Sequence, residues 1–210
     1  MIREAKKLDI RPIIGIDFRN GNKQLFTAIA KNNLGFQEMN EYLSYFIHRN
    51  QKIPDRAPNF KHVLILYPFD SAPEDLKNFE WVKIEAHQLI HLPFSKWKNR
   101  TDKLVAYHYS CFRNKRDFNA HRLLRAIDNN ALLSQLPKQE EANPNDLIEE
   151  RLLIKSRFDA YPFLFEQGEE LLNSCSIDCD FELKNDHNNL QHYTGSAEKD
   201  FKMIKKLVYH

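Results

Sequence analysis

Glycine is scarce in this sequence, with five among 210 residues, and cysteine is scarcer still, with three. So few glycines leave no Gly-rich phosphate-binding loop, and no Gly-x-Ser-x-Gly nucleophile elbow occurs. No apolar run approaches the roughly 20 residues of a transmembrane helix, so we expect no membrane partner. The first residues also lack the apolar core of a signal peptide, which favours a cytoplasmic protein.

The cysteines give no sign of a disulfide framework or a structural zinc site. Cys175 and Cys179 are separated by three residues instead of the two of a zinc or redox pair, and no second pair exists. An odd number of cysteines without a secretory leader favours free thiols in a reducing compartment.

An excess of either charge is missing as well. The 31 Lys and Arg against 29 Asp and Glu give a formal net charge of +2, so bulk charge does not identify a nucleic-acid-binding protein. Any contact with phosphates would depend on local clusters of cations. The sequence does contain 42% hydrophobic residues, including 15 Phe, which are sufficient for a sizeable core.

Short apolar runs alternate with helical patterns in the first half of the chain, which predicts an α/β fold with parallel strands. The run at 62–69 is apolar nearly throughout and should be buried on both faces, whereas 81–86 alternates as a half-exposed strand does. We predict strands at 10–18, 24–30, 62–69, 81–86 and 103–112. We predict helices at 35–50 and 71–79, and a short broken helix at 87–99.

The second half of the chain is mainly helical. We predict helices at 117–128, 146–156, 161–174 and from 197 onward to the end, a polar linker at 136–147 and an extended segment at 176–194. Asp117 is expected to cap the first of these helices, and Ser196 the last. The inward face of the first is expected to contain Ala120, Leu123, Leu124 and Ile127.

Cations are concentrated around the start of that helix. Arg113, Lys115 and Arg116 precede or open it, and Arg122 lies on it, followed by Arg125. The planar guanidinium group of arginine suits phosphate, so these four leading cations are candidate contacts to DNA phosphates. The alternative is that they are solvated and pair with neighbouring carboxylates.

The histidines suggest no metal site. His87 and His91 have the i, i+4 spacing of a helical metal-binding pair, but no Glu follows the first of them and Pro93 interrupts the segment, which favours coincidence. His121 follows Asp117 by one turn and has no evident partner for general-base chemistry. We interpret it as a structural histidine.

Four segments carry a resemblance to a known family. They are "IRPIIGIDFRNG", "FTAIAKNNLGFQEMNEYLS", "KLVAYHYSCFRNKRDFNAHRLLRAIDNNALLSQLP" and "YPFLFEQGEELLNSCSIDCDF". In order and spacing they resemble the N-terminal polymerase-and-histidinol-phosphatase (PHP) domain of the bacterial DNA polymerase III alpha subunit, most of all the Bacteroidetes kind. The resemblance covers nearly the whole chain.

This resemblance implies a partial PHP-type fold, a distorted TIM-like β/α barrel that lacks its first two strands, followed by a helical C-terminal region. The chain would be an N-terminally truncated fragment, since the family's opening His-x-His strand has no counterpart here. The implied domains are a partial barrel at 1–130, a linker and helical completion at 131–194, and the helix leading into the polymerase palm at 195–210. The open strand edge of such a barrel predicts self-association or poor solubility.

The resemblance also implies a degenerate metal site. Asp17 matches a carboxylate ligand of metal-competent PHP domains. Leu25 stands where the family has a histidine, and Tyr109 and Cys111 stand where it has an Asp-x-His pair. Leu has no donor atom and Tyr is a poor ligand for such sites. Asp17 and Cys111 are thus remnant positions, so we expect no metal cofactor and no catalytic residue in this chain.

The implied function is structural support for DNA-directed DNA synthesis, with no nucleotidyltransferase activity expected of the chain alone. Its partners would be the palm and thumb of the polymerase, DNA through the parent enzyme, and other replisome subunits, while Mg²⁺ would be held by palm residues outside the chain. Two alternatives stay open. One is a stand-alone metal-dependent phosphoesterase using Asp17, His108 and Cys111. The other is a small DNA-binding accessory protein acting through 113–125 and 199–206.

Overall fold

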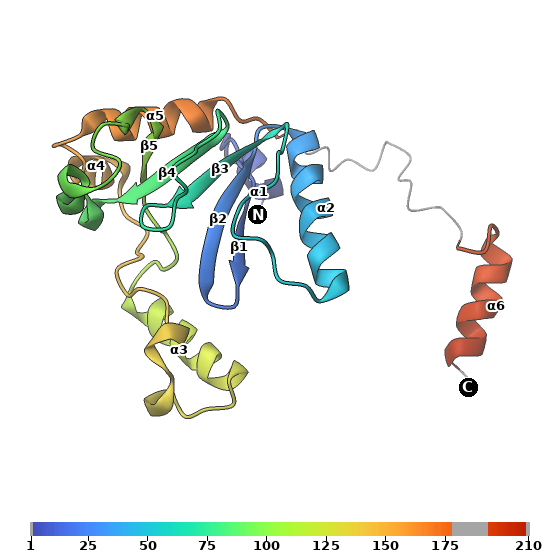
Figure 1. The fold of residues 1–210 in the computed structure, drawn as a ribbon. Coiled ribbons are helices and arrows are strands. Elements are labelled where there is room, and N and C mark those ends of the chain that lie inside the picture. The colour runs from blue at the N-terminus through green and yellow to red at the C-terminus, as the bar shows by residue number, and fades with distance from the viewer. Residues whose placement is uncertain (1, 178–192, 209–210) are drawn as a thin grey trace. The chain divides into compact units, whose positions relative to one another are not determined.

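The computed structural model of the protein describes residues 2–177 and 193–208, which belong to two separate units, each described by itself (Figure 1). The larger unit is an α/β fold around a five-stranded sheet. Its strands are β1 (Gly15–Asn20), β2 (Lys23–Ala30), β3 (Val63–Pro68), β4 (Glu80–Glu85) and β5 (Leu104–Tyr107). Its α-helices are α1 (Ile2–Lys7), α2 (Asn33–Arg49), α3 (Lys115–Asp128), α4 (Arg151–Ser156) and α5 (Pro162–Asn173). Short 3-10 helices span Ala86–Phe94, Thr101–Lys103, Leu133–Gln135 and Lys138–Glu140.

The sheet is mixed, with the strands side by side in chain order. β1–β2 and β2–β3 are antiparallel, whereas β3–β4 and β4–β5 are parallel. The predicted α/β class is confirmed, but the expectation of parallel strands holds only for the last three. β1 and β2 are joined by a tight turn at Gly21, whose φ of 59° suits glycine, and strands joined so closely must run antiparallel.

Among the described residues the sheet is open, because β1 and β5 each pair with one neighbour only. Buried residues lie on both faces of the sheet, and on one face α2 contacts β2 and β3. Phe18 and Phe26 stack there at 4.8 Å, and Met39 of α2 is fully buried. α5 contacts β5, beside which it runs in Figure 1.

The burial predicted from the hydrophobic pattern is correct for β3 and wrong for β4. Val63 to Tyr67 of β3 are all buried, as the nearly continuous apolar run predicts. The alternation expected for β4 is wrong, because Val82, Lys83 and Ile84 are buried in succession. Side chains of Thr27, Tyr107 and Tyr109 cover Lys83 on its face of the sheet, so a lysine expected in solvent is enclosed.

Four predicted elements are wrong in extent or type. The first strand spans Gly15–Asn20 instead of 10–18. The segment 71–79 contains turns instead of a helix, and the amide of Lys77 donates to the buried carboxylate of Glu80 at 2.8 Å. The last strand ends at Tyr107, because the amides of Cys111 and Phe112 bond to the Asp146 carbonyl oxygen instead of a sheet neighbour. The helix expected from residue 146 begins only at 151, after that loop.

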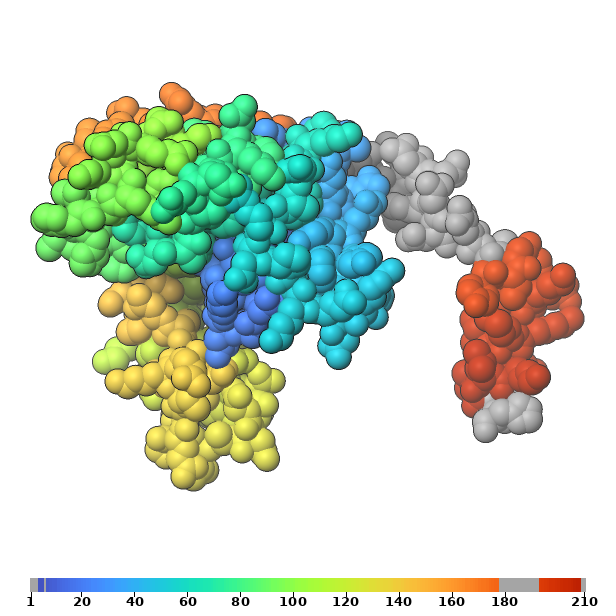
Figure 2. Space-filling model, in the orientation of Figure 1, coloured from blue at the N-terminus to red at the C-terminus, as the bar shows by residue number. Residues whose placement is uncertain are grey.

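α3 belongs to an arm that extends from the sheet (Figures 1 and 2). Its existence was predicted correctly, but the predicted cap, Asp117, and the predicted inward face are both wrong. Asn114 is the N-cap and accepts from the Arg116 amide at 2.9 Å. Phe118 and Ala126 are buried, whereas the expected inward residues are exposed. Phe118 turns the helix this way by packing on Phe112, with ring centroids 5.6 Å apart.

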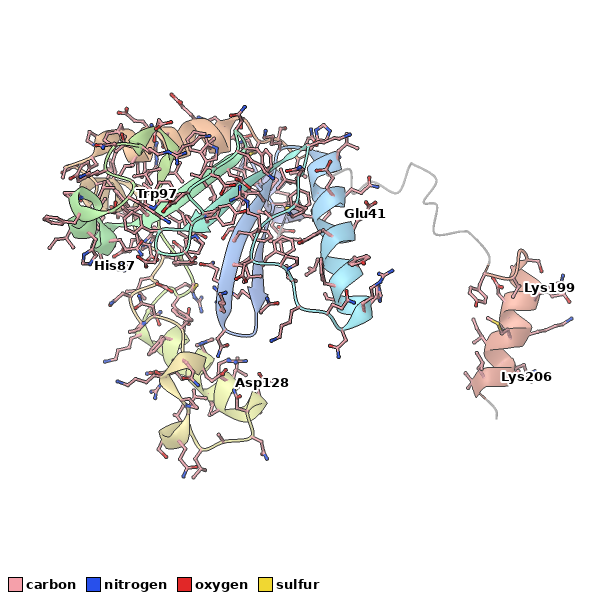
Figure 3. The ribbon with its side chains drawn as sticks, viewed as in Figure 1. Glu41, His87, Trp97, Asp128, Lys199 and Lys206 are labelled. Carbon is pink, nitrogen blue, oxygen red and sulfur yellow. The ribbon has the colours of Figure 1, made fainter. Side chains whose placement is uncertain are left out.

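The smaller unit contains α6 (Ala197–Val208). The predicted N-cap is confirmed, since the Lys199 amide donates to Ser196 Oγ at 3.3 Å. Figure 3 shows Lys199 and Lys206 near the two ends of the helix. Whether the helix continues past Val208 lies outside the described residues, as does nearly all of the segment 176–194 expected to be extended. None of the described helices has the length and apolar character needed to cross a membrane.

Two helical glycines provide a matched test of the packing. A Cβ on Gly35 in α2 would lie 2.0 Å from the His62 carbonyl oxygen, whereas one on Gly168 in α5 would meet only an ordinary contact at 3.6 Å. Gly35→Ala is therefore expected to lower the free energy of unfolding by about 2 kcal/mol or more. Gly168→Ala is expected to raise it by up to about 1 kcal/mol through helix propensity. Urea denaturation measures both; equal effects would contradict the close approach of α2 to residue 62.

Candidate functional site

A buried lysine occupies the centre of the sheet. Lys83 of β4 is 3% exposed, and its Nζ donates to Thr27 Oγ1 at 3.0 Å and to Tyr109 Oη at 2.8 Å. The rings of Tyr107 and Tyr109 flank the ammonium, with centroids 4.3 and 4.9 Å from Nζ. Such rings stabilise a cation through their negative faces. The ammonium is held by neutral groups from β2, from the end of β5 and from the segment after it.

Further hydrogen bonds connect Lys83 to Asp17, the remnant metal-ligand position that has a carboxylate. The Tyr109 hydroxyl donates to Gln24 Oε1 at 2.8 Å, and Gln24 Nε2 in turn donates to Asp17 Oδ1 at 2.5 Å. Thr27 Oγ1 also donates to this oxygen, at 3.3 Å. Arg19 Nε donates to the other oxygen, Oδ2, at 2.6 Å. Both oxygens of Asp17 are therefore engaged by side chains of β1 and β2.

Burial changes the acid–base behaviour of this cluster. It lowers the pKa of Lys83 to about 8, against the opposing effect of the negative charges of Asp17 and Glu85. It raises the pKa of Tyr107 to about 12, and it raises that of Tyr109 further. Near neutral pH the cluster therefore contains a protonated lysine and two neutral phenols. We call Lys83, Thr27, Tyr109, Gln24 and Asp17 the lysine network.

A cavity of about 460 Å³ opens at the carboxyl ends of β4 and β5, the usual place for a ligand in a parallel sheet. His108 closes one side, with Nε2 at 2.9 Å from the Leu147 carbonyl oxygen. Arg157 binds Glu149 at 2.7 Å. Burial raises the pKa of Asp146 in the same wall. Its polar lining residues are Glu85, His87, Tyr107, His108, Asn143, Asn145, Asp146 and Arg157.

The residues present do not fit the metal cluster of a metal-competent PHP domain. The oxygens of Asp17 already accept hydrogen bonds, and the lysine network brings a positive ammonium close to them. Leu25 is buried and offers no donor atom. Cys111 is an exposed thiol whose pKa is raised by partial burial, which disfavours the thiolate that binds metals. Among the described residues no three His, Cys, Asp or Glu side chains are grouped to hold a metal ion.

The cationic stretch is largely neutralised by ion pairs. Arg113 makes a two-point contact with Asp117 at 2.7 and 3.1 Å, and this pairing lowers the pKa of Asp117. Arg122 binds Glu141 at 2.6 Å. Arg125 binds Glu140 and Asp128. Lys115 and Arg116 make no ion pair within the described part of the chain.

His87 and His121 each have their own local contacts. His87 lies 3.6 Å from Glu85 and belongs to a 3-10 helix (Figure 3). Because a 3-10 helix has 3.0 residues per turn, the spacing to His91 does not place both rings on one face. His121 packs on Phe112, with centroids 5.4 Å apart, and its Nε2 accepts from the Ala142 amide at 3.3 Å. These contacts fit the structural role predicted for it.

The sequence-based reasoning missed Lys83, which is the centre of the site. Its signal was present, because one lysine interrupts the apolar residues Trp81, Val82 and Ile84. Because apolar and polar residues alternate at 81–86, Lys83 was predicted to lie on the solvent-facing side of the strand. Comparison with models of known protein families finds no match to this chain, and comparison with curated protein sequences finds none either.

The pKa of Lys83 leads to a prediction about stability. The folded-state pKa of about 8 lies below the usual 10.5, so between these values the unfolded chain binds more protons. The free energy of unfolding should therefore rise with pH, by up to about 1.4 kcal/mol per unit, until groups whose pKa burial raises begin to ionise in the unfolded chain, the cysteines Cys111 and Cys175 above about pH 9 and the tyrosines above about pH 10. Urea denaturation at pH 7, 8, 9 and 10 measures this rise.

Lys83→Met should remove that rise, whereas replacing an exposed lysine, as in Lys98→Met, should keep it. The same pH dependence in both variants would show that Lys83 is not the titrating group.

Proposed function

We propose that this chain is a non-catalytic PHP-type domain that supports DNA synthesis by a replicative polymerase of the DNA polymerase III alpha kind. The observation that carries the proposal is the lysine network. It brings the ammonium of Lys83 close to Asp17, the residue that the family resemblance assigns to a metal ligand.

An ammonium and a metal ion differ in what they can do at this place. A catalytic metal has an open coordination position and lowers the pKa of a bound water. A lysine has three hydrogen-bond donors and no such position. Lys83 supplies a positive charge among the carboxylates Asp17 and Glu85 and joins β4 to β2 and to the segment after β5. These properties suit a scaffold and oppose phosphoester hydrolysis.

The finer assignment to a PHP-type barrel belongs to this proposal, since the described sheet is itself open and mixed. Helix α2 covers one face of the sheet, and the cavity with Glu85 and His108 opens at the carboxyl ends of the parallel strands. On this proposal the five strands are part of the barrel and α6 leads into the palm. Mg²⁺ for nucleotidyl transfer would then be held by palm aspartates of the parent enzyme, with other replisome subunits as further partners.

Contacts with DNA play a secondary part in this proposal. Within the 113–125 stretch, Lys115 and Arg116 are the cations available to phosphates, since Arg113 and Arg122 would first have to leave their carboxylate partners. Two phosphate contacts give a weak and only modestly salt-dependent affinity. The 113–125 stretch by itself therefore gives the free-standing DNA-binding protein little support.

The proposal predicts no catalysis by the purified chain. It should neither extend a DNA primer with Mg²⁺ nor hydrolyse p-nitrophenyl phosphate with Mn²⁺. Its Tm should be unchanged by Mn²⁺ or EDTA, because a bound metal would raise it. Hydrolysis that disappears in Asp17→Asn would instead establish the metallophosphoesterase.

A positive test uses the catalytic region of a bacterial DNA polymerase III alpha subunit from which the PHP domain has been deleted. Adding this chain should restore part of the lost thermal stability of primer extension. An equal amount of the chain carrying Lys83→Glu, which reverses the central charge, should restore less. No binding and no stabilisation by the unchanged chain would contradict the scaffold role.

A further inference from the structure

The cavity at the carboxyl ends of β4 and β5 has more negative than positive charge in its walls. Glu85 and Asp146 line it. Its one arginine, Arg157, is already occupied, because both oxygens of Glu149 lie 2.7 Å from its Nη atoms. Lys83 donates within the lysine network and makes no ion pair with either lining carboxylate. Within the described residues, Glu85 and Asp146 therefore have no lysine or arginine partner.

Asp146 is the less compensated of the two carboxylates. Its side chain accepts no hydrogen bond and makes no ion pair in the described part of the chain, whereas its backbone carbonyl accepts from the amides of Cys111 and Phe112. Burial and the negative charge of Glu85 raise its pKa, against the opposing effect of two neighbouring histidines. A partly buried acceptor without a donor is unfavourable. A ligand with N–H groups and a positive charge would remove this cost.

His108 supplies a second acceptor to the same cavity. Its Nε2 lies 2.9 Å from the carbonyl oxygen of Leu147. Because a carbonyl oxygen only accepts, Nε2 holds the hydrogen, and in the neutral ring Nδ1 is then an acceptor. Nδ1 has no hydrogen-bond partner among the residues that the structure describes, and neither has the side-chain amide of Asn145 in the same wall.

The size of the cavity and its apolar residues determine the rest of the ligand. Its volume of about 460 Å³ is within the range of small-molecule sites. Ile154 and the buried Phe158 line it, so a short hydrocarbon stem has apolar neighbours. The unpaired carboxylates oppose an anion. A metal ion is also disfavoured, because no three suitable side chains are grouped to hold one within the described residues.

We propose that this cavity binds a small organic cation, a primary ammonium group on a short apolar stem. Asp146, Glu85 and Nδ1 of His108 are the acceptors for its N–H groups. An ammonium has three donors and no acceptor, which complements these groups. The inference goes beyond the proposed function and does not depend on it.

Titration of the full chain with n-butylammonium at pH 7 and constant ionic strength tests the proposal by two-dimensional ¹⁵N–¹H NMR. A cation of this size is expected to bind with a millimolar Kd, so its concentration is raised to about 50 mM. Saturable shifts are expected for the amides of 107, 108, 143, 145 and 146. Butyrate and 1-butanol have the same stem length and should give no saturable shift there. No saturation by butylammonium, or equal binding of butyrate or butanol, would overturn the proposal.

A pair of charge-matched variants tests the acceptor directly. Asp146→Asn should raise the Kd for butylammonium at least about tenfold, because a hydrogen bond to a charged group is lost. Asp102→Asn makes the same change in net charge at an exposed carboxylate on the 3-10 helix Thr101–Lys103 and should leave the Kd unchanged. Ile154→Trp keeps every acceptor but fills the cavity, and should abolish binding even if Asp146→Asn does not fold. An unchanged Kd in Asp146→Asn or in Ile154→Trp would contradict the proposal, as would an equal loss in Asp102→Asn.

Discussion

The arrangement of this sheet depends on the hydrogen bonds that the buried ammonium of Lys83 donates. A buried charge is strongly unfavourable unless hydrogen bonds replace its hydration, and Thr27 and Tyr109 provide them. Thr27 fixes β2 relative to β4. Tyr109 fixes the segment after β5. Its hydroxyl also donates to Gln24, which in turn donates to Asp17 on β1. One side chain therefore connects strands that are far apart in the sequence.

A second buried charge has a similar role on β4. Glu80 is fully buried and accepts from Arg56 at 2.7 Å, from the Tyr67 hydroxyl at 3.2 Å and from the Lys77 amide. These donors come from the loop before β3, from β3 itself and from the turn before β4. Removing one partner of such a buried pair typically costs about 3–5 kcal/mol. Glu80 begins β4 and Lys83 lies further along it, so both charges link this strand to neighbouring parts of the fold.

The parts of the fold that follow from local patterns were predictable. The period of α2 and the continuous apolar run of β3 identified both elements, because each buries a face that its own residues define. The failures depend on distant partners. Glu80 keeps 71–79 in turns, the Asp146 carbonyl ends β5 early, and Phe112 orients α3. In the site, the family resemblance pointed to Asp17, but only contacts with Thr27 and Tyr109, which are distant in the sequence, distinguish Lys83 from a surface lysine.

The central claim is that an ammonium takes the place of a metal ion in this protein. The most direct measurement is a crystal structure of the chain grown with Mn²⁺, with anomalous diffraction to locate the metal. The account predicts Lys83 Nζ within hydrogen-bonding distance of Thr27 and Tyr109, and no anomalous peak beside Asp17. A manganese peak bound by Asp17, with Lys83 displaced from Thr27, would contradict it.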